Sequence, residues 1–254
     1  MDKGELDAAS KYFECVDLLA NIRVNSFVIG RYSLWPFYLD QRREIEANHA
    51  VLINDINQNK YIADLGNYVL DLGDLTPKTW TNIEYLPEGK YVLKGETNSR
   101  KQQWLTSMFA PDKKSAIEIQ GRLMNDGLIG EQKIYIRQYV PLFKYIDGIG
   151  GMPVTKEFRF FVAYGQILSG GFYWQNYLED LDNIPNVGEV PKEFLQKVID
   201  KVGNKSNFYV IDVAQTELGE WIVIELNDAQ FSGLSCNDPN LLYKNLYNVL
   251  REKL

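Results

Sequence analysis

Residues 208–227, FYVIDVAQTELGEWIVIELN, decide the fold because they predict a β-hairpin with an acidic residue in each strand. A two-residue turn at Leu218 and Gly219 pairs Asp212 directly with Glu225 across the hairpin. Side chains alternate between the two faces of a strand, so Asn227 lies on the same face as Glu225. The hairpin is therefore predicted to present two carboxylates and one amide together.

Two carboxylates that face each other across a hairpin repel and weaken the strand pairing. A magnesium ion removes this repulsion, because Mg²⁺ prefers hard oxygen ligands and commonly takes one or two carboxylates together with substrate phosphates and waters. Asp212, Glu225 and Asn227 are therefore predicted to bind Mg²⁺. The alternative is a hairpin that presents its acids to solvent, and the hairpin alone leaves both interpretations open.

A lysine ends an apolar strand within residues 92–101, VLKGETNSRK. The loop after Lys94 is polar and contains small residues. Such a loop can direct backbone N–H groups at phosphates while the lysine supplies a positive charge. The segment is not a P-loop, because the GxxxxGK[ST] pattern is absent. The alternative is a lysine that is solvated at the end of its strand.

A strand predicted over residues 157–164 begins EFRFFV and alternates between a charged face and a very apolar face. Glu157 and Arg159 share the charged face. Arg159 could neutralise a transferring phosphoryl group or hold an acyl phosphate, because fixed positive charge matters most where negative charge redistributes. The alternative is a structural ion pair of Arg159 with Glu157 or Asp212.

Another predicted strand, residues 133–138, stops shortly before Pro141. The backbone groups of Gln138, Tyr139 and Val140 are expected to be free of strand pairing there. They could meet the edge of an adenine ring that apolar side chains grip.

The composition excludes several classes of protein. The chain has 254 residues, of which 45% are hydrophobic, and a formal net charge of -7, so it can bury a large core and has no broad basic surface for nucleic acid or anionic membrane. No apolar run approaches the roughly 20 residues of a membrane helix, and the acidic start lacks a secretion signal. A cytoplasmic location is therefore expected. The single histidine, His49, has no neighbouring nucleophile or second ligand, which argues against a Ser-His-Asp triad or a zinc site.

Glycine and proline in residues 71–80 mark the clearest break in the chain. Residues 1–80 predict a small N-terminal α/β lobe, with an amphipathic segment at 7–20, a strand at 26–30 and a helix at 36–47. Residues 81–254 predict an α+β domain, not alternating βαβ units. Its predicted strands are 91–94, 133–138, 157–164, 166–174, 208–213 and 221–227, and its predicted helices are 113–126, 191–203 and 239–253.

In this order, the lysine strand, the strand before Pro141, the EFR strand and the Asp…Glu-x-Asn hairpin resemble the ATP-grasp superfamily over residues 88–235. The hairpin is the most specific part, and it is similar to the metal-binding hairpin of glutathione-synthetase-like and RimK-like ligases. The resemblance implies an ATP-grasp fold, in which two α+β lobes grip the nucleotide, after a short N-terminal lobe. Residues 96–100, ETNSR, depart from the family, which has a glycine-rich loop there.

The resemblance also implies roles for individual residues. The expected ATP-binding residues lie after the lysine strand and before Pro141: Lys94, Ser99, Arg100, Lys101, Gln138, Tyr139 and Val140. Asp212, Glu225 and Asn227 would hold Mg²⁺, and Arg159 would be the catalytic residue. The expected substrate-binding residues are one arginine of the first lobe and three residues after the hairpin: Arg31, Asp228, Ser232 and Gly233.

The leading interpretation is an ATP- and Mg²⁺-dependent carboxylate–amine ligase. ATP would phosphorylate a carboxylate, and an amine would displace the phosphate to form an amide, leaving ADP. The sequence offers no evident covalent nucleophile, so catalysis would come from positioning and charge neutralisation. The expected partners are small-molecule or peptide carboxylates and amines, without a membrane or a nucleic acid, and the oligomeric state stays open.

Two alternatives remain. Lys94 could be the nucleophile of a nucleic-acid ligase that forms lysyl-AMP, although the Lys-x-Asp-Gly context is absent and the chain is acidic. The chain could also be an ATP-binding module without turnover.

Overall fold

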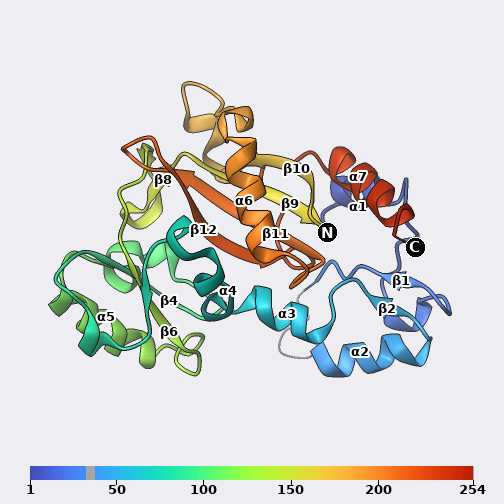
Figure 1. Ribbon diagram of the computed structural model, residues 1–254, viewed down its shortest axis with the longest axis horizontal. Coiled ribbons are helices and arrows are strands. Elements are labelled where there is room, and N and C mark those ends of the chain that lie inside the picture. Colours follow the sequence, from blue (N-terminus) through green and yellow to red (C-terminus); the bar gives the residue numbers. More distant parts are fainter. Residues whose placement is uncertain (33–37, 254) are drawn as a thin grey trace.

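The structure is a computed structural model that describes residues 1–32 and 38–253. Its main sheet has four antiparallel strands in the order β10-β9-β11-β12 (Figure 1). The four strands are β9 (Glu157–Ala163), β10 (Gln166–Phe172), β11 (Phe208–Gln215) and β12 (Trp221–Asp228). The acidic hairpin predicted from the sequence is β11–β12, at one edge of this sheet.

Alternating side chains give the main sheet two faces with different cover. Phe158 of β9 and Ile211 of β11 pack with α6 (Lys192–Val202), which crosses the sheet in Figure 1. Phe161 and Val210 belong to a separate core with α7 (Pro239–Arg251) on the opposite face. The same alternation places Arg159 on the face of Phe161, as the sequence predicted.

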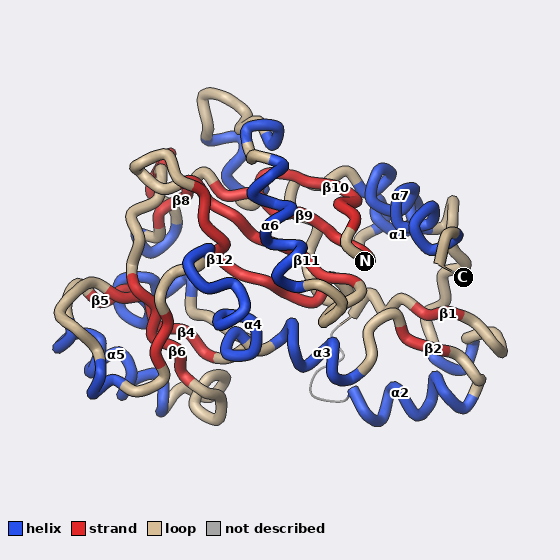
Figure 2. The backbone as a smooth tube through the Cα atoms, in the orientation of Figure 1, coloured by secondary structure: helices blue, strands red, loops and turns tan. Residues whose placement is uncertain are grey.

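A second antiparallel sheet has the order β3-β6-β4-β5 and lies beside the main sheet (Figure 2). Its strands are β3 (Thr79–Trp80), β4 (Tyr91–Gly95), β5 (Phe109–Ala110) and β6 (Ile134–Gln138). Helix α5 (Lys113–Met124) covers one face through a core that includes Leu93, Ile119 and Ile136. Further along the chain, β7 (Lys144–Asp147) and β8 (Pro153–Thr155) form a short hairpin.

The N-terminal part contributes helices and a small parallel sheet. Its helices are α1 (Lys3–Ala9), α2 (Tyr38–Ala47), α3 (Ile56–Ala63) and α4 (Leu65–Leu72), and β1 (Phe27–Val28) pairs with β2 (Val51–Leu52). Helix α1 lies against α7, so segments from both ends of the chain are neighbours (Figure 1). Within the described residues, no helix is long and apolar enough to cross a membrane.

The α+β class predicted from the sequence is confirmed, and all six predicted strands and all three later helices are present. The amphipathic segment at 7–20 is α-helical only as far as Ala9, because Tyr12 and Phe13 turn to pack on aromatic rings of α7. Positions 36 and 37 of the helix predicted at 36–47 lie outside the described residues. The division into residues 1–80 and 81–254 stays a prediction.

The predicted pairing of Asp212 with Glu225 is confirmed, but the predicted two-residue turn is wrong. The loop is 217–219, since the N–H of Thr216 donates to the carbonyl of Glu220 at 2.8 Å. Gly219 closes the loop with a φ of 86°, a conformation that residues with a side chain rarely adopt. This longer loop shifts the pairing by one residue, and a bulge at Ile224 shifts it back before Asp212 is reached.

Replacing Gly171 by alanine should destabilise the fold, because β10 carries the loop before α7 directly on its backbone. A Cβ at Gly171 would lie 2.5 Å from the carbonyl oxygen of Cys236 and 2.6 Å from the amide nitrogen of Asn237. Backbone atoms cannot turn aside as a side chain can, so we expect a loss of about 3 kcal/mol or more in the free energy of unfolding. Urea denaturation measures it.

Gly121→Ala is the matched control, because Gly121 lies in α5 and a Cβ there meets nothing within 4 Å. This change should stabilise the protein by about 0.5–1 kcal/mol through helix propensity. Equal denaturation midpoints for the two variants would contradict the close backbone approach at Gly171.

Candidate functional site

A cavity of about 280 Å³ lies between the second sheet and strand β12. The lysine strand, the segment before Pro141 and the acidic hairpin all contribute to its wall. Seven of the predicted site residues line it: Lys94, Ser99, Lys101, Gln138, Tyr139, Val140 and Glu225. The fold thus brings together motifs that are far apart in sequence, since 131 positions separate Lys94 from Glu225.

Part of the cavity wall is apolar and aromatic. Its apolar members include Met108, Leu142 and Met152. Near them, the ring of Phe109 meets Tyr139 edge-on at a centroid distance of 5.0 Å and stacks on Trp104 at 6.0 Å. A wall of this kind suits a flat, weakly polar ring such as a nucleobase.

The backbone before Pro141 is less free than the sequence suggested. The N–H of Gln138 donates to the carbonyl of Lys78 and the N–H of Tyr139 donates to the carbonyl of Lys90, both at 2.8 Å. These two donors therefore serve the second sheet. The N–H of Val140 has no partner among the described residues, so it is the donor that remains for a ligand in this segment.

The opposite part of the cavity wall is charged. The ammonium of Lys94 forms an ion pair with Oε1 of Glu225, and both side chains are largely buried. Burial alone would raise the pKa of Glu225, but the cations Lys94, Lys101 and Arg137 outweigh it and lower the pKa to about 2. The carboxylate therefore stays ionised at every physiological pH.

Arg159 forms the ion pair with Asp212 that was one of the alternatives for it. Its Nε lies 2.8 Å from Oδ1 and its Nη2 lies 2.7 Å from Oδ2, with both residues at neighbouring positions on β9 and β11. The third guanidinium nitrogen, Nη1, donates to the carbonyl of Gly233 at 2.9 Å. Neither Arg159 nor Asp212 lines the cavity, but Asp212 stands opposite Glu225, which does.

The three predicted metal ligands lie on adjacent positions of the hairpin. Asp212 faces Glu225, and Asn227 is half-buried opposite Val210 on the same side of the sheet. Each carboxylate already has one cationic partner. No cluster of three His, Cys, Asp or Glu side chains capable of holding a metal occurs within residues 1–32 and 38–253. The donor set here is two carboxylates and one amide, which suits Mg²⁺ when phosphates and waters complete the coordination.

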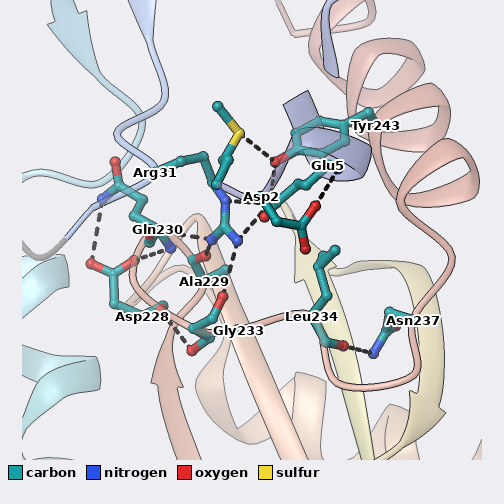
Figure 3. Close-up of polar contacts among 12 residues, drawn as sticks. Asp2, Glu5, Arg31, Asp228, Ala229, Gln230, Gly233, Leu234, Asn237 and Tyr243 are labelled. Atoms are coloured by element: carbon teal, nitrogen blue, oxygen red, sulfur yellow. Dashed lines mark hydrogen bonds and ion pairs between the residues drawn. The ribbon is translucent and has the colours of Figure 1, made fainter. Parts of the chain in front are cut away.

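Arg31 and the loop after the hairpin form a cluster of their own (Figure 3). The guanidinium of Arg31 contacts Glu5 of α1 at 2.7 Å and donates to the carbonyls of Ala229, Gln230 and Ser232. Glu5 also accepts a hydrogen bond from the hydroxyl of Tyr243 at 2.7 Å. Arg31 therefore fastens this loop to the N-terminal helix, and it does not line the cavity.

The polar groups of the predicted acceptor loop are mostly engaged with each other. Asp228 is buried and accepts hydrogen bonds from Asn59 at 2.6 Å and from the N–H of Gln230 at 2.9 Å. The hydroxyl of Ser232 donates to the carbonyl of Asp228 at 2.8 Å. Of the predicted substrate residues, only Gly233 touches another predicted site residue, Arg159.

Arg100 also lies apart from the cavity lining. Its Nε is 2.8 Å from Oδ2 of Asp126, and Asp126 accepts N–H bonds from the start of the turn that follows α5. The guanidinium holds the pKa of Asp126 at about 2. In this geometry Arg100 anchors the loop after β4, while its neighbours Ser99 and Lys101 reach the cavity.

Sequence reasoning missed Arg137, which lines the cavity from β6. Its Nη2 donates to Oγ1 of Thr76 at 2.7 Å and its Nη1 to the carbonyl of Ile224, while its buried Nε has no partner. Burial lowers its pKa. A lone arginine inside the apolar strand IYIRQ was a usable signal, because charged side chains are seldom buried without a purpose.

Glu157, Tyr173 and Trp174 were also missed as site residues. Glu157 lines the cavity at 4% exposure, with Trp174 beside it. Burial raises the pKa of Glu157 to about 7, with Asp212 raising it further and Lys101 opposing the rise. The ammonium of Lys101 donates to the hydroxyl of Tyr173 at 2.5 Å.

Comparison with known families gives one match. The model of an ATP-grasp domain, the third family of its clade, matches residues 82–246. No curated protein matches the sequence.

Solved structures with a similar fold include three ligases or synthetases. D-cycloserine synthetase has a TM-score of 0.60 at 12% identity, covering 97% of this chain and 93% of that one. The D-alanine-D-alanine ligase from Coxiella burnetii has a TM-score of 0.57 at 10% identity, with coverages of 91% and 71%. The ATP-grasp ligase PsnB, complexed with minimal precursor, Mg and ADP, has a TM-score of 0.51 at 12% identity, with coverages of 84% and 66%. At these identities, the comparisons speak to the fold.

Glu157→Gln should change how stability depends on pH. The carboxyl titrates near 4.5 when unfolded and near 7 when folded, so the folded protein binds the extra proton between these values and loses stability as the pH rises through them. Glutamine removes this loss. We expect the variant to exceed the natural protein at pH 8 by up to roughly 3 kcal/mol, with no difference at pH 4.

Chemical denaturation at the two pH values, with a chelator present, makes the comparison. Glu252→Gln, at an exposed position after α7, serves as the control and should show no such pH dependence. A stability difference for Glu157→Gln that is the same at pH 4 and pH 8 would refute the shifted carboxyl.

Arg31→Met should weaken the fold by about 3 kcal/mol, because it leaves Glu5 buried without its cation and three loop carbonyls without a donor. Arg23→Met is the control, since the Arg23 side chain is 75% exposed in its pair with Glu14 and should change stability by about 0.5 kcal/mol or less. Thermal unfolding of both variants tests this, and similar melting temperatures would remove Arg31 from its fastening role.

Proposed function

Because the chain belongs to this third family of its clade of ATP-grasp domains, we propose that it is an ATP- and Mg²⁺-dependent ligase that joins a carboxylate to an amine. One observation carries the proposal. A single cavity has an aromatic and apolar wall at one side and, at the other, the cations Lys94, Lys101 and Arg137 facing Glu225. This division matches a nucleotide, which has a flat base at one end and a polyanion at the other.

The proposed place for ATP follows from these side chains. The adenine ring would lie against Tyr139 and Met152, within reach of the free N–H of Val140. The phosphates would lie toward Lys94 and Lys101, which supply positive charge. Arg137 supports the same orientation, because its buried Nε lacks a partner and a phosphate oxygen would satisfy it.

Asp212, Glu225 and Asn227 would hold the Mg²⁺ ion. Bound there, the ion would neutralise charge on the terminal phosphates as the phosphoryl group moves. Glu225 would exchange its ion pair with Lys94 for the metal, and Lys94 would take a phosphate oxygen in return. This exchange conserves the charge balance of the buried wall, so no ion is left unpaired.

The proposed reaction has two transfers. A carboxylate oxygen of the first substrate attacks the γ-phosphorus of ATP, the bond from that phosphorus to the ADP oxygen breaks, and an acyl phosphate forms. The neutral amine of the second substrate then attacks the acyl carbon, phosphate leaves with the electron pair of the carbon–oxygen bond, and the amine loses a proton. Arg159 would steady the acyl-phosphate oxygens from the face that it shares with Asp212.

The names of the similar structures support an amide-forming ligase in general terms. They describe a D-cycloserine synthetase, a D-alanine-D-alanine ligase, and an ATP-grasp ligase complexed with Mg and ADP. No comparable observation favours a nucleic-acid ligase with Lys94 as nucleophile. The ammonium of Lys94 is bound to Glu225, and this role differs from that of a nucleophile.

Glu225→Gln should lower ADP release about 100-fold or more, because it removes a metal-binding charge while keeping the side-chain volume. The assay supplies MgATP with a panel of carboxylates and amines and separates ADP from AMP. Glu220→Gln, in the exposed turn of the same hairpin, should retain activity. Full ADP release by Glu225→Gln would exclude the proposed metal site, and AMP with label held on the protein would favour the nucleotidyltransferase.

A further inference from the structure

The ammonium of Lys101 lies in a cage made of Tyr173, Trp174 and Glu157. Its Nζ donates to the Tyr173 hydroxyl at 2.5 Å and lies 4.5 Å from the centre of the Tyr173 ring. The Trp174 ring centre is 5.4 Å away. The charges of Glu157 and Lys101 also stabilise each other across the cage. An aromatic hydroxyl, two ring faces and a carboxylate together recognise a primary ammonium.

Hydrogen bonds within the cage hold its walls in place independently of Lys101. The backbone N–H of Tyr173 donates to the carbonyl of Glu157 at 2.9 Å. The hydroxyl of Thr155 lies 3.4 Å from the indole nitrogen of Trp174 and donates to the Glu157 carboxylate at 3.3 Å. The Tyr173 and Trp174 rings meet edge-on at 4.9 Å. The cage is therefore a built feature of β8, β9 and the end of β10, and Lys101 enters it from another segment.

The cage adjoins both the cavity and the arginine proposed to steady the acyl phosphate. Glu157, Trp174 and Lys101 all line the cavity. On the other side, the guanidinium carbon of Arg159 lies 4.9 Å from the centre of the Tyr173 ring. A cation in the cage is thus next to the place where an activated carboxylate would be attacked.

We propose that this cage is the subsite for the amine substrate, and that it binds an unbranched primary alkylammonium group. The inference rests on the proposed ligase function. Lys101 shows the fit, because its own side chain is an unbranched alkyl stem that ends in a primary ammonium. Lys101 also belongs to the loop proposed to cover the phosphates of ATP, and when its ammonium contacts phosphate the cage accepts that of the substrate.

The cage also explains which molecules are rejected. The Glu157 carboxylate repels an anionic group, so a carboxylate or phosphate does not enter. An alcohol of the same length lacks the charge that the two rings and Glu157 attract, and it binds far more weakly. Selection for an amine nucleophile over water or an alcohol therefore comes from the binding step.

Lys101→Ala tests the cage without any turnover. The substitution removes the four atoms that n-propylammonium would replace, so n-propylammonium chloride should bind this variant, as measured by isothermal titration calorimetry. The natural protein, with Lys101 in the cage, should bind the probe at least about tenfold more weakly. In the Lys101→Ala background, adding Glu157→Gln or Trp174→Leu should weaken binding about five- to tenfold.

Two controls accompany the titration. Lys133→Ala removes a lysine whose side chain is 64% exposed, and it should gain no affinity for n-propylammonium. 1-Propanol should not bind Lys101→Ala. Melting temperatures show whether each variant is folded. Absence of n-propylammonium binding to folded Lys101→Ala, or equal binding with and without Glu157→Gln, would overturn the cage.

A kinetic experiment assigns the cage to the amine. With Lys101 intact, Trp174→Leu should raise the KM for the amine about tenfold while leaving the KM for ATP unchanged. An unchanged KM for the amine would overturn the assignment. Free amino acids and Nα-acetyl-lysine form the two arms, and they distinguish an α-amine from a side-chain amine. If no amine supports ADP release, the ligase function fails, while the calorimetry still decides whether the cage binds ammonium.

Discussion

The ion pair between Arg159 and Asp212 is the interaction on which the site depends. Both side chains are buried within the main sheet, where a single unpaired charge would be very costly. Their fork geometry fixes β9 against β11, and the third nitrogen of Arg159 fixes the loop at Gly233. Asp212 also faces Glu225, so the ion pair limits the negative charge that accumulates on the hairpin.

From this pair outward, acids and cations alternate through the site. Asp212 lies between Arg159 and Glu225, and Glu225 pairs with Lys94 across the cavity. Lys101 provides the next cation and Glu157 the next acid. Each charge is held by a neighbour of opposite sign, so an arriving anion or cation can exchange partners without leaving a buried ion uncompensated. This property suits a site where phosphate, metal and ammonium must bind close together.

The resemblance to ATP-grasp proteins and the α+β class were correct, and both depended on local patterns. The alternation in EFRFFV and in the hairpin strands placed Arg159, Asp212 and Glu225 on one face. The turn was predicted wrongly because loop length and bulges are set together. The additional loop residue and the unpaired Ile224 cancel, which is why the pairing of the two acids was nevertheless correct.

The sequence by itself determined the strands, their faces and the family, because alternation and motif spacing are properties of neighbouring residues. Only the tertiary structure decided which polar groups are free to act. Arg31, Arg100 and Asp228 have the composition of site residues, yet each is bound to partners that the chain brings from elsewhere. Arg137 and the Lys101 cage became visible for the same reason. The partners of a long side chain depend on how separate segments pack, and residue spacing does not contain that information.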